Sequence, residues 1–170
     1  MKLTSLGLLM ALWFPAFAAS AADETASRRA PDGFAASMLL TSDADWRAKW
    51  NTPTSTTPEF TRVDSVKRGT PIWLLVFFAN AKTDAAGAAQ ITCDIRFTRP
   101  DGKIALDQKD VSCLRGKLGS SPRNVFLAAQ NIEFNGDAGD PTGTWQVGVT
   151  VRDRLRGTGL PLFTTFTLRD

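Results

Sequence analysis

The sequence predicts an all-β protein, an antiparallel sandwich of seven or eight strands with one short helix near its N-terminus. Three observations support this fold class. Apolar residues recur at every second position in several segments, clusters of Gly, Pro, Asn and Asp separate these segments, and one stretch has helical spacing. Short strands joined by hairpin turns are typical of an immunoglobulin-like β-sandwich, which we therefore expect.

Residues 1–18 are organised like a secretory signal peptide. Lys2 supplies the positive charge, and the apolar run from Leu6 to Phe14 is too short to cross a bilayer. Small residues define a cleavage site after Ala18, and a cut after Ala21 satisfies the same rule. We expect a soluble protein that is periplasmic or secreted, without membrane insertion after signal cleavage.

The rest of the chain divides into a leader and one domain. Residues 19–32 are small and polar, which predicts a disordered leader, and residues 33–170 have the length of a single β-sandwich domain. Gly33–Thr41 is predicted as the first strand and Phe60–Val66 as a later one. Ile72–Phe78 is apolar without a gap, which predicts a central strand that is buried on both faces or partly covered by the helix or a loop.

The predicted helix covers Asp43–Trp50. Ser42 is the expected N-cap, and Asp45 follows three residues later as in a capping box. Trp46 and Trp50 are four residues apart and therefore share one helix face. Two interpretations remain open. The rings close an edge of the sheet core, or they form an exposed aromatic platform for a sugar ring or a peptide.

Cys93 and Cys113 are the two cysteines, and in an exported chain we expect them to form a structural disulfide bond. Cys93 lies on the apolar side of a predicted strand, Gln90–Thr98, and the turn at 100–102 predicts a hairpin to the strand Ile104–Val111. A symmetric hairpin would not place the two cysteines opposite one another. Either a bulge or a return from a loop must bring Cys113 to Cys93.

Three strands are predicted in the C-terminal part of the chain. Val125–Phe134 is the first, Thr144–Asp153 the second and Leu160–Leu168 the last. The second has apolar residues at alternate positions, namely Trp145, Val147, Val149 and Val151. Pro161 has no amide donor, so the beginning of the last strand should lie at a sheet edge.

Parts of the sequence resemble known bacterial modules. The turn and aromatic residue at Gly139–Trp145 look like the penultimate strand of many bacterial immunoglobulin-like modules. Most of the mature chain is also similar to a family of small exported bacterial proteins without assigned activity. The shared segments are Asp45–Trp50, Trp73–Phe78, Arg99–Lys103 and Val151–Asp153. This resemblance implies a periplasmic sandwich and transfers no catalytic residue.

The sequence contains no histidine and no tyrosine. Histidine-based catalytic triads and histidine zinc sites are therefore excluded, and no Ser-x-x-Lys or phosphate-binding glycine motif occurs. Asn135, Asp137 and Asp140 lack the spacing of a calcium loop, so we interpret them as a hydrogen-bonded turn. We expect no enzyme activity, no metal and no cofactor.

Arg152, Arg154 and Arg156 are predicted to project from the last hairpin, either as solvated side chains or as a contact for anionic envelope material. The net charge of +3 is too small to indicate nucleic-acid binding. We expect a non-enzymatic periplasmic or cell-surface binding module whose partner is an envelope protein or a glycan. It would dock near Trp46 and Trp50, on a sheet edge or on loops. The alternative is a carbohydrate-binding or carbohydrate-active protein that uses the tryptophan platform.

Overall fold

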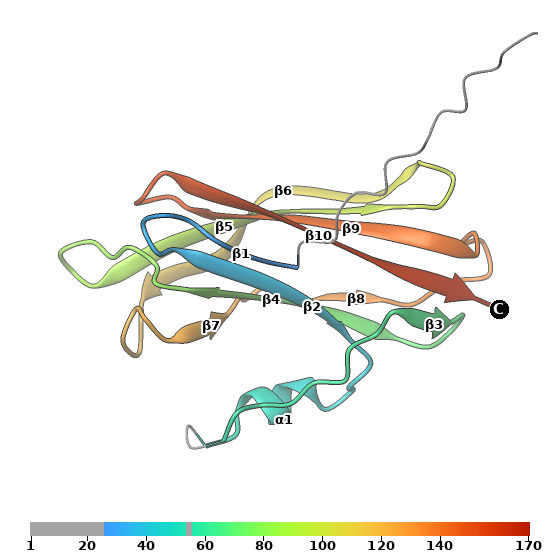
Figure 1. Cartoon of the computed structure of the whole chain (residues 1–170), viewed down its shortest axis with the longest axis horizontal. Coiled ribbons are helices and arrows are strands. Elements are labelled where there is room, and N and C mark those ends of the chain that lie inside the picture. The colour runs from blue at the N-terminus through green and yellow to red at the C-terminus, as the bar shows by residue number, and fades with distance from the viewer. Residues whose placement is uncertain (1–25, 54–55) are drawn as a thin grey trace, which may run out of the picture.

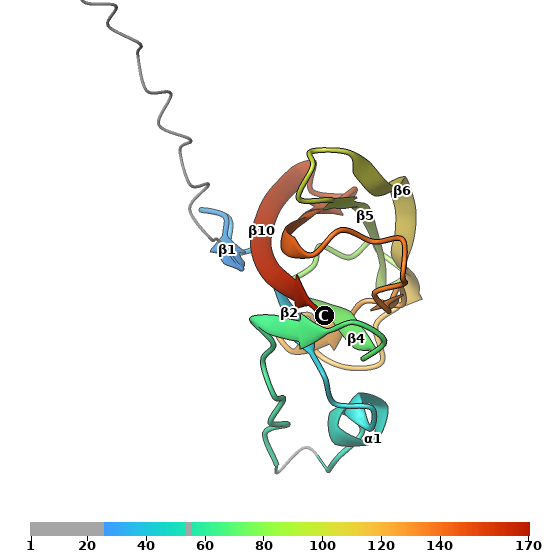
Figure 2. The ribbon, with the colours of Figure 1, turned by 90° about the vertical axis from the view of Figure 1, so that its right-hand side faces the viewer.

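The computed structural model describes residues 26–53 and 56–170. In this part of the chain, two five-stranded sheets face one another and enclose the core, which confirms the predicted sandwich (Figures 1 and 2). The predicted signal peptide and both of its cleavage sites lie outside the described residues. Within them, no helix is long and apolar enough to cross a bilayer.

We name each sheet after its central strand. The β9 sheet contains, in spatial order, β3 (Ser65–Lys67), β10 (Thr158–Arg169), β9 (Gly143–Asp153), β5 (Ala88–Thr98) and β6 (Ile104–Lys117). The β4 sheet contains β1 (Ser27–Arg29), β2 (Ala35–Thr41), β4 (Ile72–Ala79), β7 (Val125–Leu127) and β8 (Ile132–Phe134), and both of the last two pair with β4. Neighbouring strands are antiparallel except β3 and β10, which are parallel. More strands form than were predicted, because β1 was not expected and the predicted strand Val125–Phe134 is divided into β7 and β8. The prediction of a strand at Phe60–Val66 is correct only at its end, since β3 covers Ser65–Lys67.

The core has β9 at its centre, as the alternation of its sequence predicts. Its inward side chains are at most 1% exposed: Trp145, Val147, Val149 and Val151. Phe134, which lies on β8 in the opposite sheet, has its ring centre 4.9 Å from those of both Trp145 and Phe166. Aromatic pairs at this separation attract one another beyond the burial of their surface. This aromatic cluster therefore joins the two sheets.

The outer face of β4 is apolar and is covered by the segment that connects β2 to β3. We call residues 42–62 of this segment the excursion; it contains the helix α1 (Trp46–Trp50) and lies outside the β4 sheet (Figures 1 and 2). The ring centre of Phe77 is 5.4 Å from that of Trp50 and 6.2 Å from that of Phe60. Leu75, which also faces outward, has no exposed surface. The prediction of a central strand partly covered by the helix is confirmed.

Two predictions near the N-terminus are wrong. Ser27–Arg29 was expected to belong to a disordered leader, yet these residues pair with β2 as the edge strand β1. The predicted capping box at Ser42 does not form, because the helix begins only at Trp46 and no side chain caps it. The Asp43 carboxylate instead accepts the Thr61 amide at 2.8 Å. This bond joins the two arms of the excursion.

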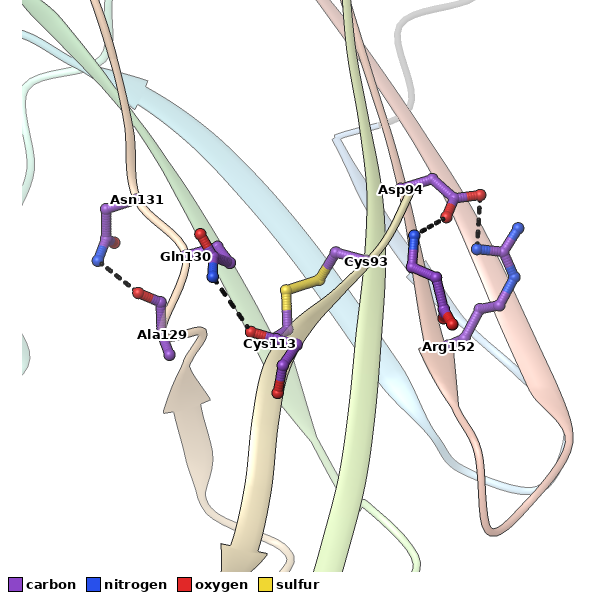
Figure 3. Close-up of a disulfide and its surroundings, with 9 residues drawn as sticks. Cys93, Asp94, Cys113, Ala129, Gln130, Asn131 and Arg152 are labelled. Atoms are coloured by element: carbon purple, nitrogen blue, oxygen red, sulfur yellow. Dashed lines mark hydrogen bonds and ion pairs between the residues drawn. A yellow bond between two sulfur atoms is a disulfide. The ribbon is translucent and has the colours of Figure 1, made fainter. Parts of the chain in front are cut away.

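The hairpin β5–β6 contains the disulfide bond, and a bulge brings its two cysteines together (Figure 3). Ile91 pairs with Leu114, whereas Thr92 pairs with Ser112, so Cys113 is the extra residue of β6 at this point. The Cα atoms of Cys93 and Cys113 are 5.9 Å apart, and both residues are fully buried. The structure thus selects the bulge over the return from a loop.

The predicted strand Val125–Phe134 is divided into β7 and β8, because the chain between them crosses the open side of the sandwich. The amide of Ala128 bonds to the Val76 carbonyl on β4, and the amide of Ala129 bonds to the Cys113 carbonyl on β6, both at 2.8 Å. The prediction for Pro161 is confirmed. It pairs with Thr150 on β9, and on the other side of β10 the described strands pair only with its C-terminal end.

Candidate binding surface

The two tryptophans of α1 do not form the exposed platform that was one interpretation of their spacing. Trp46 is only 4% exposed, and the Arg47 guanidinium carbon lies 4.4 Å from the centre of its ring. Trp50 is half-buried against Phe77. The apolar outer face of β4 draws these rings inward, because their burial removes it from water. The tryptophans are thus part of the packing, as in the other interpretation, but they cover the outer face of the central strand β4 and not an edge of the sheet core.

The arginines near the last hairpin are not brought together as a cationic patch. A guanidinium nitrogen of Arg152 lies 2.6 Å from the Asp94 carboxylate on β5, and a guanidinium nitrogen of Arg154 lies 2.6 Å from the Asp110 carboxylate on β6. Figure 3 shows the first of these pairs on the far side of β5 from the disulfide. Each positive charge therefore has a carboxylate at short range, which weakens any attraction of anionic material.

Arg156, the third arginine, fastens the hairpin to the body of the sandwich. Its guanidinium donates to the Asp153 carboxylate at 3.3 Å and to the Asn80 carbonyl at 2.8 Å. Asp153 is 1% exposed and also accepts the amides of Lys82, Leu155 and Arg156. Asp153 was predicted only as the last residue of the strand Thr144–Asp153. Its position two residues after Val151, on the buried side of β9, was the signal that it lies inside.

A hollow lies on the solvent-facing side of the β9 sheet, and Gly148 is at its centre. Gly148 is flanked in register by Arg96 on β5 and by Phe163 on β10, and Arg96 pairs in turn with Asp107 on β6. The four residues form one row across four strands. Because glycine has no side chain, the row is interrupted between a guanidinium group and an aromatic ring.

The hollow has a volume of about 480 Å³. Its lining combines charged, polar and apolar side chains that reach solvent, namely Asp94, Arg96, Asp107, Lys109, Thr150, Pro161 and Phe163. Arg96 and Asp107 form an ion pair at 3.0 Å, with 49% and 30% of their side chains exposed. The charged groups and the half-buried ring of Phe163 are thus accessible from solvent.

Neither the backbone nor the packing requires glycine at position 148. Its φ is not positive, the pairing of β9 with both neighbours is continuous around it, and an added Cβ would meet no heavy atom within 4 Å. Gly136 is different, since an added Cβ there would lie 2.6 Å from Leu168. Glycine inside a strand is destabilising and often marks a place where a ligand approaches the backbone closely.

Two carboxyl groups near the hollow have a lowered pKa, Asp94 in its lining and Asp110, which follows the lining residue Lys109. Partial burial acts to raise the pKa of Asp94, but the amide of Asp110 and the Arg152 guanidinium donate to its carboxylate and keep the pKa below its ordinary value. The pKa of Asp110 is lowered by the Thr92 hydroxyl and, against partial desolvation, by Arg154. Neither group is therefore suited to donate a proton near neutral pH.

A second recess, of about 430 Å³, opens between β6 and β8. Its apolar lining includes Phe97, Phe134 and Trp145. These rings belong to the packing that joins the sheets, with Phe134 stacked 6.2 Å from Phe97. Core packing explains this recess, whereas it does not explain Gly148.

The long sheet edges are poorly suited to receive an added strand. The pairing of β6 with β5 is interrupted by three register shifts, which twist an edge and leave residues unpaired. On β10, Pro161 removes an amide donor. Docking on a sheet edge, which the sequence analysis allowed, is therefore less favoured by the geometry than docking on the open face around Gly148.

The hollow was not predicted from the sequence. A glycine at an outward position in the middle of an alternating strand was a visible signal. The residues around it come from three other strands, and their placement beside Gly148 depends on the register of the sheet, which a single sequence does not provide.

The sequence matches no protein-family model, and no curated protein matches it at a significant level. Solved structures with similar folds include the Niemann-Pick type C2 protein from Japanese carpenter ant, with a TM-score of 0.40 and 9% identity over 78% of this chain and 89% of that one. The CARDB domain of a Pyrococcus furiosus protein, in complex with di-metal ions, has a TM-score of 0.39 and 11% identity over 63% and 81% of the two chains.

A family 123 glycoside hydrolase from Clostridium perfringens has a TM-score of 0.44 and 8% identity over 79% of this chain. The match spans 27% of the length of the hydrolase. Similarity at this level concerns the immunoglobulin-like sandwich fold alone.

Proposed function

We propose that this protein is a non-enzymatic binding module of the bacterial envelope, and that its binding surface is the solvent-facing side of the β9 sheet around Gly148. The observation that carries the proposal is the hollow at Gly148, a glycine for which neither conformation nor packing gives a reason. Selection for an open binding surface would explain the glycine, since any larger residue would fill the space that a partner occupies.

Two features support an exported location. Residues 1–18 have the organisation of a signal peptide, and the Cys93–Cys113 bond is of the kind that persists in oxidising compartments. The resemblance to small exported bacterial proteins agrees with them. The proposal therefore places the protein in the periplasm or outside the cell, with an envelope component as its partner.

Two further features support binding without catalysis. The sequence has no histidine, and in the lining of the hollow the Asp94 carboxylate is paired with Arg152 and has a lowered pKa. Enzymes that transfer protons near neutral pH use groups whose pKa lies close to that value. A surface of permanently charged, paired side chains is better suited to accept and donate hydrogen bonds to a bound partner.

The proposal is tested by measuring how much of the purified mature protein co-sediments with isolated cell-envelope material. Gly148→Thr fills the hollow with a residue that favours strands, so we expect binding to fall about tenfold or more while the fold is kept. Gln146→Thr is the matched control, because Gln146 is exposed on the same strand and the same face but does not line the hollow. Equal binding by Gly148→Thr and the wild type would remove the basis of the proposal.

A further inference from the structure

The charges around the hollow at Gly148 restrict the chemistry of its ligand, an inference that rests on the proposed binding function. The charged side chains in its lining are two carboxylates and two cations, Asp94 and Asp107 with Arg96 and Lys109. Asp107 lies 3.0 Å from Arg96 and 3.9 Å from Lys109. Opposite charges at these distances leave little net field over the hollow. An anionic or a cationic ligand would gain little there, so an uncharged ligand is favoured.

The same pairs keep a large capacity for hydrogen bonding. A carboxylate has about four acceptor positions and a guanidinium has five donors, and one ion pair uses only a part of them. Arg96 and Asp107 retain 49% and 30% of their side-chain surface exposed, and the Lys109 side chain is 68% exposed. Donors and acceptors therefore alternate along one wall of the hollow. A ligand with several hydroxyl groups, each of which both donates and accepts, matches such a wall.

Phe163 forms the opposite wall. It pairs directly with Gly148 across the β9–β10 ladder, and its ring does not fill the space above the glycine, since an added Cβ would meet nothing within 4 Å. The face of an aromatic ring carries negative partial charge and attracts the C–H groups of an apolar molecular surface. A ligand that fits between the walls has one apolar side toward Phe163 and hydroxyl groups toward Arg96 and Asp107.

We propose that the hollow binds an uncharged sugar ring, as part of a neutral glycan of the cell envelope or its surroundings. Pyranose rings combine an apolar C–H face with equatorial hydroxyl groups, which are the two properties that the walls require. The carbohydrate hypothesis raised by the sequence is thus placed on Gly148, Phe163 and Arg96 in place of the helix tryptophans.

The proposal is tested by titrating the folded mature protein with neutral oligosaccharide probes, namely maltohexaose, cellohexaose, laminarihexaose and hexa-N-acetylchitohexaose, in a calorimeter. We expect at least one probe to bind with a Kd below about 5 mM. Gly148→Thr should lower the affinity for that probe about tenfold or more while its melting temperature is unchanged or higher. Phe163→Leu should lower it by a similar factor, and Gln146→Thr should leave it unchanged.

Charged probes examine the other part of the inference. Oligogalacturonate and chitosan oligomers have rings of similar shape with negative and positive charge, and they should bind more weakly than the best neutral probe. The inference is overturned if no neutral probe binds, if a charged probe binds best, or if Gly148→Thr binds as well as the wild type.

Treating the envelope material before co-sedimentation shows whether the partner is a glycan or a protein. It therefore tests the sugar proposal separately from the proposed binding surface. Digestion with a glycosidase that cleaves the linkage of the best neutral probe should abolish binding, and proteinase K should not. Loss of binding after proteinase K alone, together with sensitivity to Gly148→Thr, would identify a protein partner. That result would refute the sugar and leave the proposed binding surface standing.

Discussion

At the scale of single residues, the buried carboxylate of Asp153 holds the end of β9 to neighbouring segments. The Asp153 carboxylate, with no exposed side-chain surface, accepts three amides and the Arg156 guanidinium. A buried carboxylate is tolerated only when its acceptor positions are satisfied in this way. The same carboxylate holds Lys82, near the start of the β4–β5 connection, against the β9–β10 hairpin.

We expect Asp153→Ala to destabilise the fold by about 2–4 kcal/mol, because it leaves three amides and a guanidinium without their acceptor. Urea unfolding measured by fluorescence gives the change in the free energy of unfolding. Asp64→Ala is the control. The Asp64 side chain is 82% exposed and forms a surface pair with Arg62, so its loss should change stability by less than about 0.5 kcal/mol. Similar losses for both variants would contradict the assigned role.

A second residue makes stability depend on pH. The Lys49 ammonium, 2.8 Å from the Asp43 carboxylate, together with the Thr61 amide, lowers the pKa of Asp43 from 3.8 to about 2. Since the pKa is lower in the folded state, the carboxylate stabilises the fold above pH 4, and this contribution is lost as the pH falls from about 4 to about 2.

We therefore expect Asp43→Asn to reduce the melting temperature at pH 7 and to have little effect at pH 2. The melting temperatures of the wild type and Asp43→Asn, measured from pH 7 to pH 2, show whether the stabilisation by Asp43 decreases as the pH falls. Asp45→Asn is the matched control, because Asp45 is 66% exposed and lies 3.7 Å from the same ammonium. A difference between wild type and Asp43→Asn that persists unchanged at pH 2 would refute the linkage.

At the scale of elements, the sequence predicted what depends on local pattern. The long strands β4, β5, β9 and β10 begin within two residues of their predicted positions, because alternation and turn residues are local signals. The three-residue strands depend on distant partners, so β1 was missed, β7 and β8 were merged, and β3 was predicted to begin five residues too early, at Phe60. The extra residue at Cys113 could not be predicted either, because a bulge is defined by its register with β5. The row around Gly148 escaped prediction for the same reason.

The disulfide should stabilise the hairpin that contains it. Twenty residues separate Cys93 from Cys113 in sequence, and closing a loop of this length stabilises the fold by about 3 kcal/mol in the chain-entropy model. We expect the double variant Cys93→Ala/Cys113→Ala to lose roughly this amount in urea unfolding, with faster amide exchange along β6. The reduced wild type, with its thiols intact, separates the loss of the bond from the loss of the sulfur atoms. Unchanged stability in both would show that the bond contributes nothing.

At the scale of the whole molecule, the last strand completes both the β9 sheet and the core. β10 pairs along its length with β9 and at its end with β3, and it contributes Leu162, Phe166 and Leu168 to the interior. Before β10 is added, β9 has one unpaired edge and the aromatic cluster lacks a ring. The fold is therefore assembled from contacts between residues that are distant in sequence, a topology that folds slowly.

A chain that ends at Gly157 should consequently fail to form the sandwich. We expect it to lack near-ultraviolet circular dichroism and dispersed amide resonances. A chain that begins at Ala30 is the comparison, because among the described residues it loses Ala26 and the exposed edge strand β1, and it should retain both signals with a modest loss of stability. A dispersed spectrum from the shortened C-terminal variant would show that β10 is dispensable for the core.

The excursion has a consequence for how such proteins diversify. It leaves β2 and rejoins the sandwich at adjacent points, where Thr41 pairs with Arg62 and the Val63 amide bonds to the Leu40 carbonyl at 3.0 Å. The sandwich therefore holds both ends of the excursion in place, whatever sequence lies between them. Related sequences can therefore replace or lengthen the excursion without changing the order of the strands. Each new segment must supply apolar side chains that cover Leu75 and Phe77.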